Sequence, residues 1–228
     1  MKNSLSASPS RKETQWGFGY LVFQLLLLPG LLNFANSYAG LSDSELNFVF
    51  FLTNFLAILG IFHNFLGASA AQMIRHPAYF CQAVILGYVA YQVCIYGVSW
   101  IISWLSPGYV NANDASIAAM SRNGYFLMVV GTVILVPPVE ECLYRGLIFR
   151  KLWSINRWAA YIVSTLVFAL IHILGFIGVY SPVELVLAVL QYVPAGICLA
   201  WSYVKADTIF APILIHAIVN AVGISNMR

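Results

Sequence analysis

Two adjacent glutamates and an arginine stand inside an apolar stretch of this chain, in the segment PPVEECLYRGLIFR at residues 137–150. Ionisable groups are costly at membrane depth, and those that persist there usually line a cavity and carry function. On a helix, Glu141 and Arg145 are four residues apart with the acid nearer the N-terminus, which is the favourable order for an ion pair. Glu140 is rotated from Glu141 by about 100°, because a helix has 3.6 residues per turn. The spacing predicts that Arg145 holds Glu141 while Glu140 faces elsewhere and is free for chemistry.

Three further polar residues lie in apolar stretches of the C-terminal half. His172 stands in VFALIHILGF, and His216 and Asn220 stand four residues apart in PILIHAIVNAVG, so these two share one helix face. At a rise of ~1.5 Å per residue, Glu140, His172 and His216 each lie about 16–21 Å along a helix from the nearest basic turn. The similar depths predict that the four side chains line one cavity. Together they supply a base, its partner and hydrogen-bond donors, the parts of a hydrolytic or acyl-transfer site.

Each of these residues also has a structural interpretation. An intramembrane histidine or asparagine often forms only a hydrogen bond between helices, and a glutamate–arginine pair can be purely structural. A glutamate with two histidines is also an acceptable catalytic zinc shell, in which Glu140, His172 and His216 would bind Zn²⁺. The chain has no HExxH motif, and Asn220 is a better donor to an oxyanion than a zinc ligand. These features favour a site without cofactor over a zinc site.

The composition indicates the elements that must position these residues. The 228 residues are 61% hydrophobic and 8% charged, whereas about 25% charged residues is usual in soluble domains. Several apolar runs reach the roughly 20 residues needed to cross a bilayer. We therefore predict an all-α fold, a polytopic transmembrane bundle of about 7–8 spans in contact with the lipid bilayer. No P-loop, dinucleotide fingerprint or basic run points to nucleotides or nucleic acid as partners.

The chain divides into three predicted parts. Residues 1–15 are expected to be a polar, mobile cytoplasmic leader, residues 16–123 the N-terminal transmembrane helices with a polar loop at 106–123, and residues 124–224 the catalytic core. The helix at 124–152 is expected to bend or restart at Pro137 and Pro138, which suit a first helical turn. A restart would place Glu140 near a positive helix end. The predicted spans are 16–35, 47–67, 79–105, 124–152, 158–179, 184–204 and 209–224.

Seven spans place the basic residues unequally on the two sides. One side receives nine of the eleven, namely Lys2, Arg11, Lys12, Arg75, Arg145, Arg150, Lys151, Arg157 and Lys205. By the positive-inside rule this side, with the N-terminus, is cytoplasmic. We expect an integral protein of the plasma membrane whose site faces the cytoplasmic side or the membrane interior. An eighth span would move the C-terminus to the other side.

The order and spacing of the polar residues resemble the three motifs of the CPBP family. That family holds the type II CAAX prenyl endopeptidases and the bacterial Abi proteins of bacteriocin processing and immunity. The resemblance covers residues 124–224, and residues 1–123 match only as generic preceding spans. The motifs read Glu140-Glu141-x-x-x-Arg145, Phe168-x-x-x-His172 and His216-x-x-x-Asn220 in this chain.

The resemblance implies an intramembrane endopeptidase. In such a site Glu140 with His172 would activate a water to attack a peptide carbonyl. His216 and Asn220 would donate hydrogen bonds to the oxyanion, where preorganised donors contribute most. The neighbouring ion pair would orient the helix and the first carboxylate. The family has often been called a metalloprotease family, so the resemblance is compatible with Zn²⁺ or with no cofactor.

Three functions compete at this point. The leading one is an endopeptidase that cuts a membrane-associated peptide or protein, either of CAAX type or of bacteriocin-leader type. The second is a non-enzymatic bacteriocin-immunity or partner-binding protein with the same fold. The third is a small proton-coupled transporter in which glutamates and histidines relay protons. Asn220 beside His216 favours the enzyme over the transporter, because an oxyanion hole needs donors there and a proton relay does not.

Overall fold

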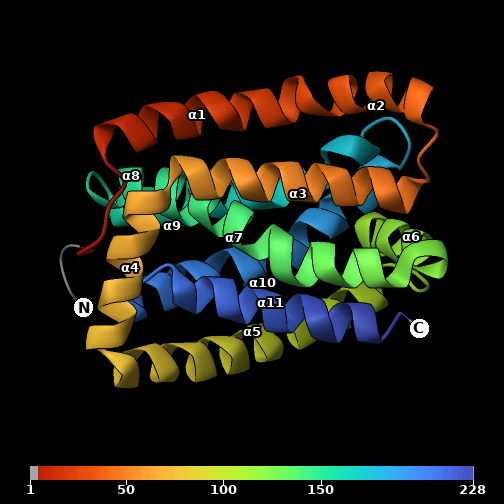
Figure 1. Cartoon of the computed structure of the whole chain (residues 1–228). Coiled ribbons are helices and arrows are strands. Elements are labelled where there is room, and N and C mark those ends of the chain that lie inside the picture. The colour runs from red at the N-terminus through yellow and green to blue at the C-terminus, as the bar shows by residue number, and fades with distance from the viewer. Residues whose placement is uncertain (1–4, 228) are drawn as a thin grey trace.

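The computed structural model describes residues 5–227 as a bundle of long helices, and this part of the chain contains no strand (Figure 1). The predicted all-α fold is confirmed. The first half comprises α1 (Arg11–Leu26), α2 (Leu28–Ala39), α3 (Asp43–Ile61), α4 (His63–Arg75) and α5 (Pro77–Leu105). The second half comprises α6 (Ala112–Val129), η1 (Val130–Leu135), α7 (Val136–Glu141), η2 (Cys142–Phe149), α8 (Arg150–Trp153), α9 (Arg157–Ile173), η3 (Leu174–Phe176), α10 (Pro182–Ala206) and α11 (Phe210–Ser225).

Five of the helical segments are long and apolar enough to cross a membrane. A sixth arises if α1 and α2, which meet at a bend of 49°, form one span. The seventh predicted span corresponds to α11, which is apolar but has only 16 residues. The count by length is therefore five or six, below the predicted seven to eight. The segments that qualify alone are Asp43–Ile61, Pro77–Leu105, Ala112–Trp153, Arg157–Phe176 and Pro182–Ala206.

The N-terminal segment is docked against the bundle, so the prediction of a mobile leader is wrong for its described part, which starts at residue 5. Leu5 and Ala7 are buried. The backbone N–H of Ser6 donates to Asp207 Oδ1 at 2.7 Å, and Arg150 donates to the carbonyl of Leu5 at 3.3 Å. These hydrogen bonds, together with the burial of Leu5 and Ala7, hold this polar segment against the bundle. Residues 1–4 of the predicted leader lie outside the described residues.

The predicted second span at 47–67 is broken in two. Phe62 leaves the helical conformation with φ −103° and ψ 20°, and α4 starts directly after it. Figure 1 shows α4 crossing the end of the bundle where the N-terminus lies. The carboxylate of Glu13 in α1 accepts the Phe65 N–H at 2.9 Å, in the first turn of α4. A buried carboxylate from another helix therefore caps α4, which no local pattern around residue 62 indicates.

Only the first third of the predicted loop at 106–123 is a loop. The Asn111 side chain accepts the N–H groups of Asn113 and Asp114 and so starts α6 at Ala112. Asparagine is among the preferred residues at this capping position. Gly124, with φ −146° and ψ 45°, then kinks α6. The helix that was predicted to begin at Gly124 is the part of α6 beyond this kink.

The central helix runs without a break through Pro137 and Pro138, so the predicted restart is wrong. Two stretches of wide π-helical turns, η1 and η2, flank the short α7. The N–H of Val136 bonds to the carbonyl of Gly131, five residues earlier. The wider turn keeps the helix continuous where the prolines remove backbone donors. Glu140 consequently lies within a long helix and not at a positive helix end.

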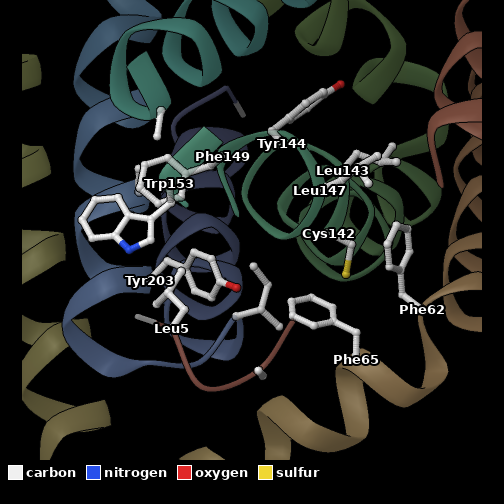
Figure 2. Packing of buried hydrophobic residues seen from close by; sticks show 14 of the residues in the cluster. Leu5, Phe62, Phe65, Cys142, Leu143, Tyr144, Leu147, Phe149, Trp153 and Tyr203 are labelled. Carbon is white, nitrogen blue, oxygen red and sulfur yellow. The ribbon is translucent and has the colours of Figure 1, made fainter. Parts of the chain in front are cut away.

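The main apolar core surrounds η2, near the basic turns (Figure 2). Phe62 and Phe65 pack from the α3–α4 corner, and Phe149 stacks on Trp153 with ring centroids 5.3 Å apart. This end of the bundle is filled with side chains. The other labelled members of the cluster in Figure 2 are Leu5, Cys142, Leu143, Tyr144, Leu147 and Tyr203.

Candidate active site

Glu141 lies at the centre of a buried polar group. Its Oε1 accepts a hydrogen bond from Arg145 Nη1 at 2.9 Å and another from His216 Nδ1 at 2.8 Å. The side chains of Glu141 and Arg145 are both fully buried, with 0% exposure. The guanidinium also lies over the Phe168 ring, 4.3 Å from its centroid, and donates to the carbonyl of Ala195. The predicted pairing of Arg145 with Glu141 is confirmed, and the pair in turn holds His216.

Glu140 points away from that group toward two histidines. Its Oε2 lies 3.7 Å from His172 Nε2 and 4.0 Å from His216 Nε2. Among residues 5–227 this oxygen has no hydrogen-bond partner. The two glutamates therefore differ as the spacing predicted: Glu141 bonds to Arg145 and His216 through Oε1, and Glu140 faces the two histidine Nε2 atoms.

The hydrogen bonds of the two histidines determine which ring nitrogen faces Glu140. His172 Nδ1 bonds to the Phe168 carbonyl at 2.7 Å, and His216 Nδ1 bonds to the Glu141 carboxylate at 2.8 Å. A carbonyl or carboxylate oxygen only accepts, so each Nδ1 is the donor. Both Nε2 atoms are left facing Glu140. Tyr192 stacks on the His172 ring with centroids 4.2 Å apart and restricts its orientation further.

The Asn220 side chain is held at the site by a hydrogen bond to a helical carbonyl that has no backbone donor. Pro137 has no N–H to give to the Thr132 carbonyl five residues earlier, and the Val136 N–H is used by Gly131. Asn220 Nδ2 donates to this Thr132 carbonyl at 2.8 Å. The bond ties α11 to η1, as the structural interpretation of Asn220 predicts. An amide nitrogen carries two hydrogens, so a second donor remains.

Glu140, His172, His216 and Asn220 all line one cavity of about 500 Å³. The predicted convergence at one depth is confirmed. The volume falls in the range of roughly 300–1,000 Å³ that is usual for ligand sites. The cavity extends to the start of α6 and the end of α11, and Figure 1 shows both at the end of the bundle opposite α4 and α8. Its lining residues therefore extend toward the end of the bundle away from the basic turns. That the site faces the cytoplasmic side or the membrane interior stays a prediction.

Within residues 5–227, no group of three or more His, Cys, Asp or Glu side chains is arranged to hold a metal ion. Glu140, His172 and His216, the predicted zinc ligands, face one another but do not form such a group in this arrangement. The zinc site stays a prediction.

In a comparison with known families, residues 122–222 match the family model described as "Type II CAAX prenyl endopeptidase Rce1-like". This part of the chain is similar to the Rce1-like family. The resemblance that the three motifs indicated is thereby confirmed, and all six predicted site residues lie inside the match. The match supports a CAAX-type intramembrane protease at the level of the family, and the long apolar helices support an integral membrane protein. The chain has no significant match among curated proteins and none among solved structures.

Sequence reasoning missed three residues around the candidate site. Tyr192 stacks on His172, Thr132 offers its carbonyl to Asn220, and Asp114 lines the cavity. Tyr192 is one of thirteen tyrosines, and Asp114 fell in a segment predicted to be a loop. No sequence pattern indicated the Thr132 carbonyl, because in a regular α-helix Pro137 and Pro138 remove the donors to Val133 and Ile134. The π-helical turn of η1 moves the missing donor to Thr132.

Proposed function

We propose that the protein hydrolyses peptide bonds in membrane-associated peptides or proteins, with Glu140 as the base that activates water. The observation that carries this proposal is the free Glu140 Oε2, which faces two histidine Nε2 atoms inside a cavity. A carboxylate without a partner at this depth is costly, and such groups usually have a function. The family match supports a protease at the coarser level.

The first step uses Glu140 and His172. Their facing atoms are 3.7 Å apart, too far for a direct hydrogen bond, and a water in the cavity beside them can bond to both. Glu140 takes a proton from this water as its oxygen attacks the substrate carbonyl carbon. The proton then passes to the amide nitrogen as the carbon–nitrogen bond breaks. One product ends in a new carboxyl group and the other begins with a new amine.

The second part of the site stabilises the oxyanion. The free amide hydrogen of Asn220 is one donor, and His216 Nε2 is the other when both nitrogens of its ring are protonated. Glu141 orients the ring by accepting a hydrogen bond from its Nδ1, and Arg145 holds Glu141 in place. One such donor contributes roughly 10²–10³-fold in rate.

The test compares wild type with Glu140→Gln on fluorogenic prenylated and unprenylated peptides in detergent, with and without a strong chelator. We expect Glu140→Gln to lower kcat by roughly 10²–10⁴-fold, the usual contribution of a general base. Wild-type turnover should survive the chelator. Glu184→Gln is the matched control, because Glu184 caps α10 in contact with Ser181 and does not line the cavity.

Two results would contradict this mechanism. Loss of turnover with chelator, restored by zinc, would make Glu140, His172 and His216 metal ligands. Turnover of no peptide at all would favour an immunity or partner-binding role, or a proton-coupled transporter, over an enzyme.

A further inference from the structure

The cavity has an unequal distribution of charged side chains. Two carboxylates, Glu140 and Asp114, line it, while no lysine or arginine among residues 5–227 does. Arg145 is fully buried behind Glu141 and does not reach the cavity. The two histidines in the wall each use Nδ1 in a hydrogen bond within the protein. A ligand in this space therefore meets negative charge that no nearby basic side chain balances.

Asp114 lies at the end of the cavity that is farther from the core around η2. It is in the first turn of α6, and its side chain is exposed to the cavity space. It forms no ion pair with residues 5–227, and it lies close enough to His172 for an electrostatic interaction. Its carboxylate is thus available to a ligand that has already reached the catalytic residues.

The cavity wall mixes apolar residues with amide side chains, and the amides suit a peptide backbone. Amide side chains from five helices and one loop line the cavity, and Asn111 Nδ2 donates to Gln191 Oε1 at 2.7 Å. Amides can both donate to and accept from peptide groups, but they do not neutralise a charge. Asp114 therefore determines the charge preference of this part of the cavity. The amide residues in the wall are Asn47, Gln92, Asn111, Asn113, Gln191 and Asn220.

We propose that Asp114 is a specificity-determining residue that makes the cavity select peptide segments with a cationic side chain near the scissile bond. The inference rests on the proposed peptidase function and names its substrate class. A lysine or arginine of the substrate pairs with the free carboxylate. An acidic side chain, or the free C-terminal carboxylate of a peptide cut close to its end, meets like charge with no cation to compensate. Such an unpaired charge rejects a ligand as effectively as a clash.

The test uses peptide series in which one Lys, Gln or Glu is moved through successive positions on both sides of the scissile bond. Binding is measured by fluorescence anisotropy in detergent, and cleavage is measured separately. At the best position we expect wild type to bind the Lys peptide about tenfold more tightly than the Glu peptide, the size of one partly solvated ion pair. Asp114→Asn should remove most of this preference, and Asp114→Lys should reverse it. The preference should also weaken at high salt.

Asp43→Asn is the matched control. Asp43 is exposed in the first turn of α3, at the same end of the bundle, and does not line the cavity (Figure 1). This variant should keep the full charge preference. Thermal unfolding of each variant shows that the fold is intact.

The two readouts separate this inference from the proposed function. Charge-dependent binding without cleavage would contradict the proposed peptidase function and would support the role of Asp114 in binding. Cleavage with no preference for Lys, or a preference that Asp114→Asn leaves unchanged, would overturn the inference. Failure of every peptide in the series to bind wild type would overturn it as well.

Discussion

At the scale of single residues, Arg145 shows how the site keeps a charge inside the bundle. Its guanidinium is fully buried and contacts the Glu141 carboxylate, the Ala195 carbonyl and the Phe168 ring. Taking two charges out of water is expensive, and only good geometry with further hydrogen bonds offsets the cost. Arg145 therefore acts on the catalytic site indirectly, by holding the carboxylate that orients His216.

Replacing Arg145 with leucine should destabilise the protein strongly. Arg145→Leu leaves the Glu141 charge buried without its partner, which costs about 3–5 kcal/mol. Arg145→Lys keeps the charge but lacks the planar group that stacks on Phe168, so its loss should be smaller. Unfolding in detergent measures both effects. Arg122→Leu, at an exposed position in α6, is the control and should unfold like wild type.

The double variant Glu141→Leu with Arg145→Leu removes both charges together. It should regain part of the stability, because no unpaired ion is left behind. Equal stability of Arg145→Leu and wild type would show that the pair does not support the fold.

At the scale of elements, the close approach of α9 and α10 places Tyr192 on His172. The two helices meet at Gly196, where a Cβ atom would lie 2.5 Å from Thr165 Cγ2. Tyr192 is one turn before Gly196 on α10, and His172 is on α9. The distance between these helices consequently sets how the His172 ring is held.

A methyl group at Gly196 should move this contact. Gly196→Ala forces the β-branched Thr165 or the α10 backbone to shift, and overpacking of this kind costs about 1–3 kcal/mol. We expect lower thermal stability and a lower kcat, because Tyr192 no longer lies flat on His172. Gly97→Ala in α5 is the control, since nothing lies within 4 Å of the added methyl group there. A variant at Gly196 with unchanged unfolding and turnover would disprove the role of this contact.

At the scale of the whole molecule, the two ends of the bundle differ. The end near the basic turns is filled by the aromatic core of Figure 2 and by the docked segment that starts at Leu5. The cavity reaches the opposite end, at the start of α6. If the basic turns are cytoplasmic, as the positive-inside rule predicts, the cavity opens away from the cytoplasm.

Labelling with a membrane-impermeant maleimide tests this orientation. In a background with the exposed Cys81 and Cys94 replaced by serine, Ala115→Cys marks the cavity end and Ser154→Cys marks the basic end. We expect the Ala115 variant to react in intact cells and the Ser154 variant to react only after permeabilisation. The reverse pattern would show that the cavity opens to the cytoplasm.

The sequence by itself determined the residues of the candidate site and their relative depth. Each motif lies within one helix, and the helical repeat alone separates Glu140 from Glu141 and pairs His216 with Asn220. The membrane strengthens this signal, because a polar side chain in an apolar run is rare there unless it is used. The all-α fold follows from the same property, since helices satisfy their backbone hydrogen bonds internally.

Only the tertiary structure decided the direction of the cavity and the residues that complete it. Asp114, Tyr192 and Thr132 come close to the motif residues through packing between helices far apart in the chain, which no local pattern encodes. The docked N-terminal segment and the cap that Glu13 places on α4 are likewise long-range contacts. Local periodicity specifies which face of a helix carries a group. Which helices meet, and which end of the bundle they fill, depends on the fit of side chains across the whole molecule.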